Sequence, residues 1–207
     1  MNEALVNGPN GFAPSYDIGG AVEWEIGSFS AKGVAMGVGE NDDGNSYNYY
    51  AVQLGYHPKT GLGEGNYRVI LATTTEGFLD PAQEKKEAQQ ATILSFDQEL
   101  GEVLGAWIRF GWGDDAPVLV WKNLYSGGID IKGRWWNREK DNIGIGLAHL
   151  SRGNQEIDKT WASETYYRFV FNEILSATAD VQYMKDEFQE GDDRKGWFFG
   201  VRLTAEF

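Results

Sequence analysis

Charged side chains alternate with apolar ones in several stretches of this chain. Arg68 lies between Tyr67 and Val69, and Arg109 lies between Ile108 and Phe110. Successive side chains of a β-strand point to opposite faces, so this spacing gives each strand one polar and one apolar face. Arg and carboxylate groups can exchange hydrogen bonds with the hydroxyls of a solute, and Trp or Tyr offers an apolar ring face. The candidate solute-contacting residues on the polar face are Arg68, Asp97, Glu99, Trp107, Arg109, Asp130, Lys132, Arg134, Tyr166, Arg168, Asp180 and Arg202.

The sequence offers little for catalysis or metal binding. There is no cysteine, and His57 and His149 are the only histidines, so we expect no catalytic residue, no metal and no cofactor. The glycines of residues 61–65 precede a strand rather than a helix, which argues against a phosphate loop. Glu23 and Glu25 share one strand face, and we expect them to line a polar wall rather than to form a glycosidase pair.

The polar faces belong to a series of short strands joined by turn residues. The pattern predicts about eleven strands and an all-β, antiparallel fold in one domain over residues 1–207, with residues 1–19 as a loop. The segment 75–91 interrupts the alternation. It predicts a polar surface loop with a short helix, for which Asp80 is the cap and Pro81 the first helical residue.

The last strand could cross a membrane. Its apolar positions run through Trp197, Phe199, Val201 and Leu203 to the terminal Phe207, and its length suits a tilted strand in a bilayer, roughly 9–11 residues. An edge strand of a soluble sheet has the same pattern. The mean hydropathy of −0.45 is compatible with both, because a barrel needs apolar residues only at alternate positions.

Three features favour a transmembrane barrel over a soluble sheet. Links expected to be long (39–46, 75–91, 113–121, 152–162, 185–194) alternate with links expected to be short (27–30, 100–102, 137–141, 172–174) or of medium length (58–65). The polar face carries charges of both signs at strand centres, which suits a wet lumen. Aromatic residues such as Tyr50, Trp112 and Trp197 lie near strand ends, as interfacial belts require. The apolar sets, including Val34 and Met36, should then face lipid.

This phase places Phe207 on the periplasmic side and residues 1–19 on the outer side. Barrels of this kind have an even number of strands with both termini in the periplasm, so we expect an odd number of strands before residue 1. The first residues also lack the pattern of a signal peptide. We therefore expect the chain to be the C-terminal part of a larger protein, although a closed barrel of its own with about ten or twelve strands stays open.

Seven phrases occur in an order that resembles the carbohydrate-selective outer-membrane porin family (OprB type). They are GNYRVIL (65–71), LSFDQEL (94–100), AWIRFGW (106–112), GGIDIKG (127–133), DNIGIG (141–146), ETYYR (164–168) and ADVQY (179–183). The resemblance spans residues 8–207 and implies the C-terminal portion of a barrel of about sixteen strands that passes mono- and oligosaccharides by diffusion. The N-terminal portion of the family pattern is missing.

We therefore favour a porin of the bacterial outer membrane without enzymatic activity. We expect outer-membrane lipid and transported sugars as partners, with a homo-oligomer such as a trimer left open. The net charge of −13 argues against nucleic acid. One alternative is an outer-membrane barrel whose loops act as an adhesin or enzyme, through segments 75–91 and 185–194, and another is a soluble β-sandwich binding domain.

Overall fold

The chain folds into one large antiparallel sheet. The structure is a computed structural model that describes residues 5, 18–41 and 43–206. The sheet has 12 strands, and its main path runs in chain order, β1-β2-β3-β5-β8-β9-β10-β11-β12-β13-β14. These strands are β1 (Gly19–Ile26), β2 (Phe29–Glu40), β3 (Ser46–Tyr56), β5 (Gly63–Thr74), β8 (Gln90–Leu100), β9 (Leu104–Gly113), β10 (Trp121–Lys132), β11 (Asn142–Arg152), β12 (Ile157–Val170), β13 (Leu175–Phe188) and β14 (Arg194–Ala205).

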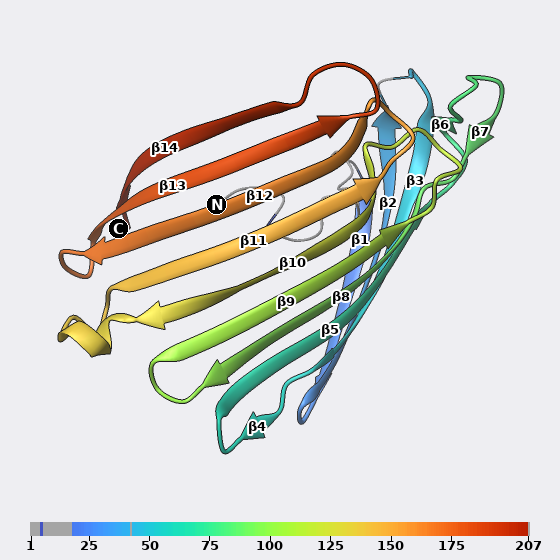
Figure 1. Cartoon of the computed structure of the whole chain (residues 1–207). Coiled ribbons are helices and arrows are strands. Elements are labelled where there is room, and N and C mark those ends of the chain that lie inside the picture. The colour runs from blue at the N-terminus through green and yellow to red at the C-terminus, as the bar shows by residue number, and fades with distance from the viewer. Residues whose placement is uncertain (1–4, 6–17, 42, 207) are drawn as a thin grey trace.

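The sheet curves strongly into a trough, with β1 to β3 on one wall and β11 to β14 on the other (Figure 1). The short strand β4 (Lys59–Thr60) pairs only with β5, and β6 (Phe78–Leu79) pairs with β7 (Lys86–Glu87) outside the main sheet. Within residues 18–206, β1 and β14 each have a partner on one side only, so the sheet is open there. The prediction of an all-β, antiparallel, barrel-type fold is confirmed.

No helix among the described residues has the length and apolar character needed to span a membrane.

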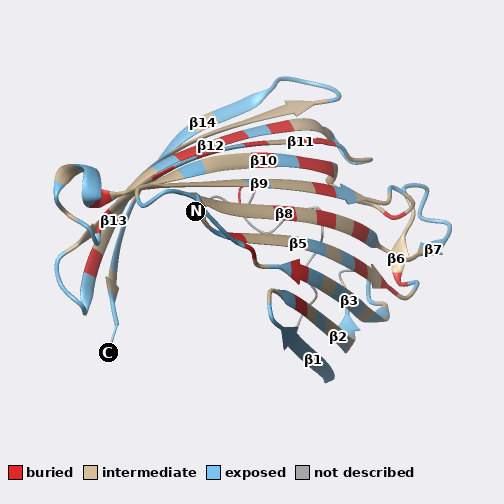
Figure 2. Ribbon diagram, turned by 90° about the horizontal axis from the view of Figure 1, so that it is seen from below, coloured by how far each residue is buried: buried red, intermediate tan, exposed pale blue. Residues whose placement is uncertain are grey.

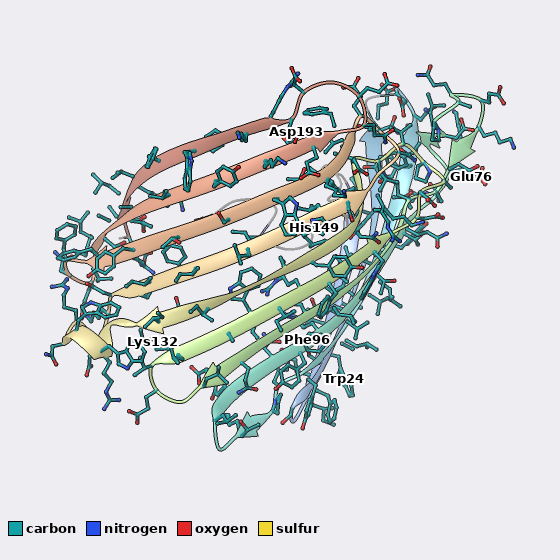
Figure 3. The ribbon with its side chains drawn as sticks, viewed as in Figure 1. Trp24, Glu76, Phe96, Lys132, His149 and Asp193 are labelled. Carbon is teal, nitrogen blue, oxygen red and sulfur yellow. The ribbon has the colours of Figure 1, made fainter. Side chains whose placement is uncertain are left out.

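The two ends of the trough carry different connections. Short turns follow β1, β8 and β12, whereas loops 41–45, 75–89, 114–120, 153–156 and 189–193 all lie at the other end. Figure 3 shows Glu76 and Asp193 at this loop end and Lys132 at the turn end. The predicted phase is therefore correct, but the predicted lengths are not all correct. The link expected at 152–162 shrinks to 153–156 because β12 already begins at Ile157. The link expected at 137–141 grows to 133–141 because β10 ends in the 3₁₀ helix η3 (Gly133–Trp136).

The segment 75–91 contains no helix, so that prediction was wrong. It forms the β6–β7 hairpin, which projects from the loop end (Figure 1). The Asp80 carboxylate accepts the N–H groups of Glu84 and Lys85 at 2.7 and 3.1 Å, and it therefore closes a turn instead of capping a helix. The ring of Phe78 packs edge-on against Tyr47, with centroids 4.7 Å apart. Helix propensity is a weak prior, and a segment too polar to bury a helical face gains nothing from that conformation.

The convex face of the sheet is apolar and exposed. Val22, Val52, Leu71, Leu147 and Val201 all lie on it with 49–81% of their surface accessible. Most positions of the sheet are intermediate or exposed, and buried ones form short patches (Figure 2). An ordinary soluble sheet would cover such a face, so its exposure indicates that lipid is the intended neighbour.

Aromatic rings form two rows on this convex face. Near the turn end, Phe29, Tyr56, Tyr67 and Phe96 make a continuous row across four strands, with centroids 4.9, 6.4 and 5.7 Å apart. Nearer the loop end, ring pairs include Phe110–Tyr125, His149–Trp161 and Tyr183–Trp197. Two belts separated by an aliphatic band match the two interfaces of a bilayer.

Strand β2 faces the opposite way from the prediction. The register pairs Gly33 with Val52, so β2 presents Ala31, Gly33 and Ala35 to the convex side and Val34 and Met36 to the concave side. The sequence of β2 alternates small with larger apolar residues, which gives no polarity contrast. The register with β3 therefore decides the orientation of β2, because Val52 and Leu54 on β3 already define the lipid side.

Candidate functional site

The concave wall carries the predicted polar residues. Arg68 pairs in register with Ser95, Ser95 with Arg109, and Arg109 with Ser126, so these positions share one face across four strands. Most of the predicted solute-contacting residues lie on this face because strand periodicity fixes their direction.

Asp97 on β8 joins two arginines from neighbouring strands. Its two carboxylate oxygens accept Arg68 Nη2 at 2.5 Å and Arg109 Nη2 at 3.0 Å. Arg68 also donates to Ser95 Oγ at 3.1 Å, and the guanidinium of Arg109 lies 4.8 Å from the ring centroid of Trp107. Arg109 is only 15% exposed, so the surroundings hold these groups in fixed positions on the wall.

A second charge pair lies nearer the turn end. Lys132 Nζ donates to Glu99 Oε1 at 2.9 Å, and the other oxygen of Glu99 accepts the backbone N–H of Glu64 at 3.1 Å. Five predicted residues line one groove of about 440 Å³ there, namely Asp97, Glu99, Trp107, Asp130 and Lys132.

Tyr166 is fixed by polar neighbours on β10 and β11. Asn142 Nδ2 donates to Asp130 Oδ1 at 2.6 Å and to the Tyr166 hydroxyl at 3.1 Å, and the hydroxyl lies 3.4 Å from the same Asp130 oxygen. Trp107, Arg109, Asp130 and Tyr166 line a second pocket of about 290 Å³ together with Glu164 and the glycines of β11. The structure thus brings aromatic faces, carboxylates and a guanidinium together on one wall.

Four predicted residues lie outside this cluster, although Asp180 pairs in register with Tyr166. Arg134, expected on the polar face of a strand, lies instead in η3 and pairs with Glu102 at the exposed turn end, because β10 ends at Lys132. Arg168 lines a separate groove near the turn end. Asp180 accepts Gln182 Nε2 at 2.7 Å, and Arg202 pairs in register with Thr178 on the far wall. Glu23 lies on the concave side as predicted, where it pairs with Lys32.

The concave wall is apolar near the loop end of β10 and β11, which was not predicted from the sequence. Leu124 and Leu150 are fully buried there, and they cluster with Leu5, Ala148 and Ala162. These leucines occupy the same alternating positions as the polar residues nearer the turn end of their strands, so alternation along each strand would have revealed their face. Asn142 and Glu164 were also missed, although both occupy polar-face positions.

No group of three or more His, Asp or Glu side chains that could hold a metal ion occurs among the described residues.

An open, strongly curved antiparallel sheet with a lipid-type convex face and a polar concave face is the wall of a porin-type β-barrel. The family model for carbohydrate-selective porins of the OprB family matches residues 6–207. The chain therefore belongs to the OprB porin family.

Solved structures of porins share this fold. Pseudomonas putida OprB matches with a TM-score of 0.72 and 18% identity over 90% of this chain and 58% of its own. Pseudomonas aeruginosa OpdK with vanillate matches with a TM-score of 0.57 and 8% identity over 86% of this chain and 55% of its own. The chain thus spans less than two thirds of the length of these structures. The search of curated protein sequences gives no significant match.

Proposed function

We propose that this chain forms part of an outer-membrane pore through which small, neutral carbohydrates pass by passive diffusion. The observation that carries this proposal is the pairing of charges on the concave wall. Asp97 lies between Arg68 and Arg109, and Glu99 is paired with Lys132. A wall of this kind offers many donors and acceptors to hydroxyl groups without a large net charge that would hold an ion.

This pairing argues against a charged solute as the preferred one. A pore that collects carboxylates needs basic groups whose charge is left uncompensated along the path. One of the matched structures holds vanillate, a carboxylate. On the present wall, Arg68, Arg109, Lys132 and Lys32 all lie within ion-pair distance of a carboxylate.

The aromatic side chains of the wall support a sugar rather than an acyclic solute. Trp107 and Tyr166 project from β9 and β12 into one pocket, together with carboxylate and guanidinium groups. A sugar ring has apolar C–H faces and a polar rim, so it fits an aromatic face surrounded by hydrogen-bonding groups. Each contact is weak, which allows the solute to leave as readily as it enters.

The test is a liposome-swelling assay with the full-length protein purified from the cells that naturally produce it. We expect swelling in isosmotic glucose that scales with the amount of protein. Empty liposomes and liposomes with boiled protein serve as controls. Absence of glucose-dependent swelling by correctly inserted protein would contradict the proposal.

We also propose the bacterial outer membrane as the location, because the convex face is an exposed apolar band with aromatic rows at both margins. The measurement is heat-modifiable migration of the outer-membrane fraction on a detergent gel. Recovery of the protein only in the soluble fraction would contradict this location.

A further inference from the structure

The pocket between Trp107 and Tyr166 has a floor made of glycine. Gly128 lies on β10, and Gly144 and Gly146 lie on β11. The register pairs Gly128 with Gly146 and Asp130 with Gly144, so these glycines form a continuous patch of bare backbone between β9 and β12.

Each aromatic ring reaches over one of these glycines. A Cβ atom added at Gly144 would overlap the ring of Tyr166. A Cβ atom at Gly128 would overlap the carbonyl oxygen of Ile145 and would come within 2.8 Å of Cε2 and Cζ2 of Trp107. The ring of Tyr166 thus leans from β12 over β11, and the ring of Trp107 leans from β9 over β10, so the two rings lean toward each other.

Polar groups surround the two rings. The hydroxyl of Tyr166 is held by Asn142 and Asp130, which fixes the ring against the wall. Arg109 and Glu164 line the same pocket of about 290 Å³. Leu5 closes another side, with Cδ1 3.2 Å from the position a Cβ would take at Gly146. This volume lies at the small end of ligand pockets, which are about 300–1,000 Å³.

We propose that this pocket is a subsite for a single neutral pyranose ring, in which Tyr166 supplies the stacking face, Trp107 forms an apolar wall, and Gly144 and Gly128 are the positioning residues that leave room for those rings. This rests on the proposed function and names the position where the sugar binds. The ring of Tyr166 meets the C–H face of the sugar. The Arg109 guanidinium lies over the Trp107 ring, 4.8 Å from its centroid, and it reaches the sugar hydroxyls together with Asp130 and Glu164.

The experiment measures inhibition of the single-channel ion current by glucose and by mannitol. Mannitol carries a similar set of hydroxyls but has no ring face to stack. Wild type should give a lower half-inhibiting concentration for glucose than for mannitol. Tyr166→Ala should raise the glucose value by about two- to tenfold and leave mannitol unchanged. Tyr166→Phe keeps the ring but loses the hydroxyl contacts to Asn142 and Asp130, so its glucose value should fall between those of wild type and Tyr166→Ala.

Gly144→Ala should also raise the glucose value, because its methyl group displaces the ring. In the Tyr166→Ala background the same substitution should add nothing, since Gly144 acts through Tyr166. Gly33→Ala is the matched control, because its methyl group would meet only an ordinary contact of 3.5 Å with Val22 on the convex side. Heat-modifiable migration checks the folding of each variant, and the Tyr166 variants test the subsite even if Gly144→Ala does not fold.

The outcomes separate the two proposals. If wild type neither passes glucose nor responds to it, the proposed function itself fails. If wild type passes glucose but Tyr166→Ala leaves its half-inhibiting concentration unchanged, or glucose and mannitol inhibit wild type equally, the subsite is overturned and the pore is not. If Gly144→Ala has the same effect with and without Tyr166, its positioning role is overturned.

Discussion

Asp141 should be the main electrostatic anchor of the β10–β11 turn. Its side chain is 1% exposed and accepts four hydrogen bonds from three residues. Arg138 donates at 2.5 and 3.2 Å, the Tyr167 hydroxyl at 2.5 Å and the Val170 N–H at 2.9 Å. These donors, led by Arg138, lower the pKa of Asp141 from 3.8 to about 2. The turn is thereby tied to β12.

The free-energy contribution follows from that pKa shift. A shift from 3.8 to about 2 corresponds to roughly 2 kcal/mol in favour of the folded, charged state. Arg138 is 39% exposed, and solvent weakens its share, so we expect Asp141→Asn to destabilise the fold by ~1–2 kcal/mol at pH 7. Because the folded pKa lies below the unfolded one, this contribution is present above pH 4 and disappears as the pH falls to about 2.

The assay is denaturant unfolding of the refolded protein in detergent micelles, for wild type and Asp141→Asn at pH 7 and near pH 2. Glu139→Gln is the matched control, because Glu139 is an exposed carboxylate in the same turn, and it should change stability by less than about 0.5 kcal/mol. A difference between wild type and Asp141→Asn that is equally large at both pH values would refute the reasoning, since it would not depend on the charge of Asp141.

Three further predictions concern the wall and the loops. Asp97→Asn leaves Arg68 and Arg109 with less compensation of their charge. One charge at ~6 Å in water changes the energy of a passing ion by about 0.7 kcal/mol, so the anion-to-cation permeability ratio, taken from the zero-current potential in a KCl gradient, should rise about threefold. An unchanged potential would contradict the paired-charge account. Val52→Arg on the lipid face should cost about 2–4 kcal/mol of stability, whereas its neighbour Gln53→Arg on the concave face should cost far less, and equal costs in unfolding measurements would mean the faces are wrongly assigned. Asp80→Ala removes the acceptor for Glu84 and Lys85 and should speed proteolysis of the 75–89 loop without changing conductance; loop cleavage at the wild-type rate would argue against the turn-closing role of Asp80.

Period-two alternation was enough to predict the sheet wherever the two faces differ in polarity. Strands such as β9 and β14 carry Arg109 or Arg202 on one face and Ile108 or Val201 on the other, so their orientation follows from sequence. In β2 both faces are apolar or small, and only pairing with β3 decides that Val34 faces inward. The register of neighbouring strands is non-local information that a single segment does not contain.

The sequence predicts which face of the sheet each candidate residue lies on, but it does not predict which residues contact one another. Asp97, Asp130 and Tyr166 were placed on the correct face by parity, yet their partners depend on inter-strand register. Arg134 failed because Gly133 begins a 3₁₀ turn, and nothing in the alternation of residues 129–135 marks that end. The position of the Tyr166 ring over Gly144 likewise depends on the pairing of β11 with β12.

The most direct test of the central claim is the relative rate at which glucose and glucuronate enter liposomes that contain the protein. The two solutes share a pyranose ring and differ by one carboxylate, so the ratio isolates charge from size. Because Asp97 pairs with Arg68 and Arg109 and Glu99 pairs with Lys132, glucose should enter clearly faster than glucuronate at low ionic strength. Faster entry of glucuronate would contradict a pore whose wall prefers neutral sugars.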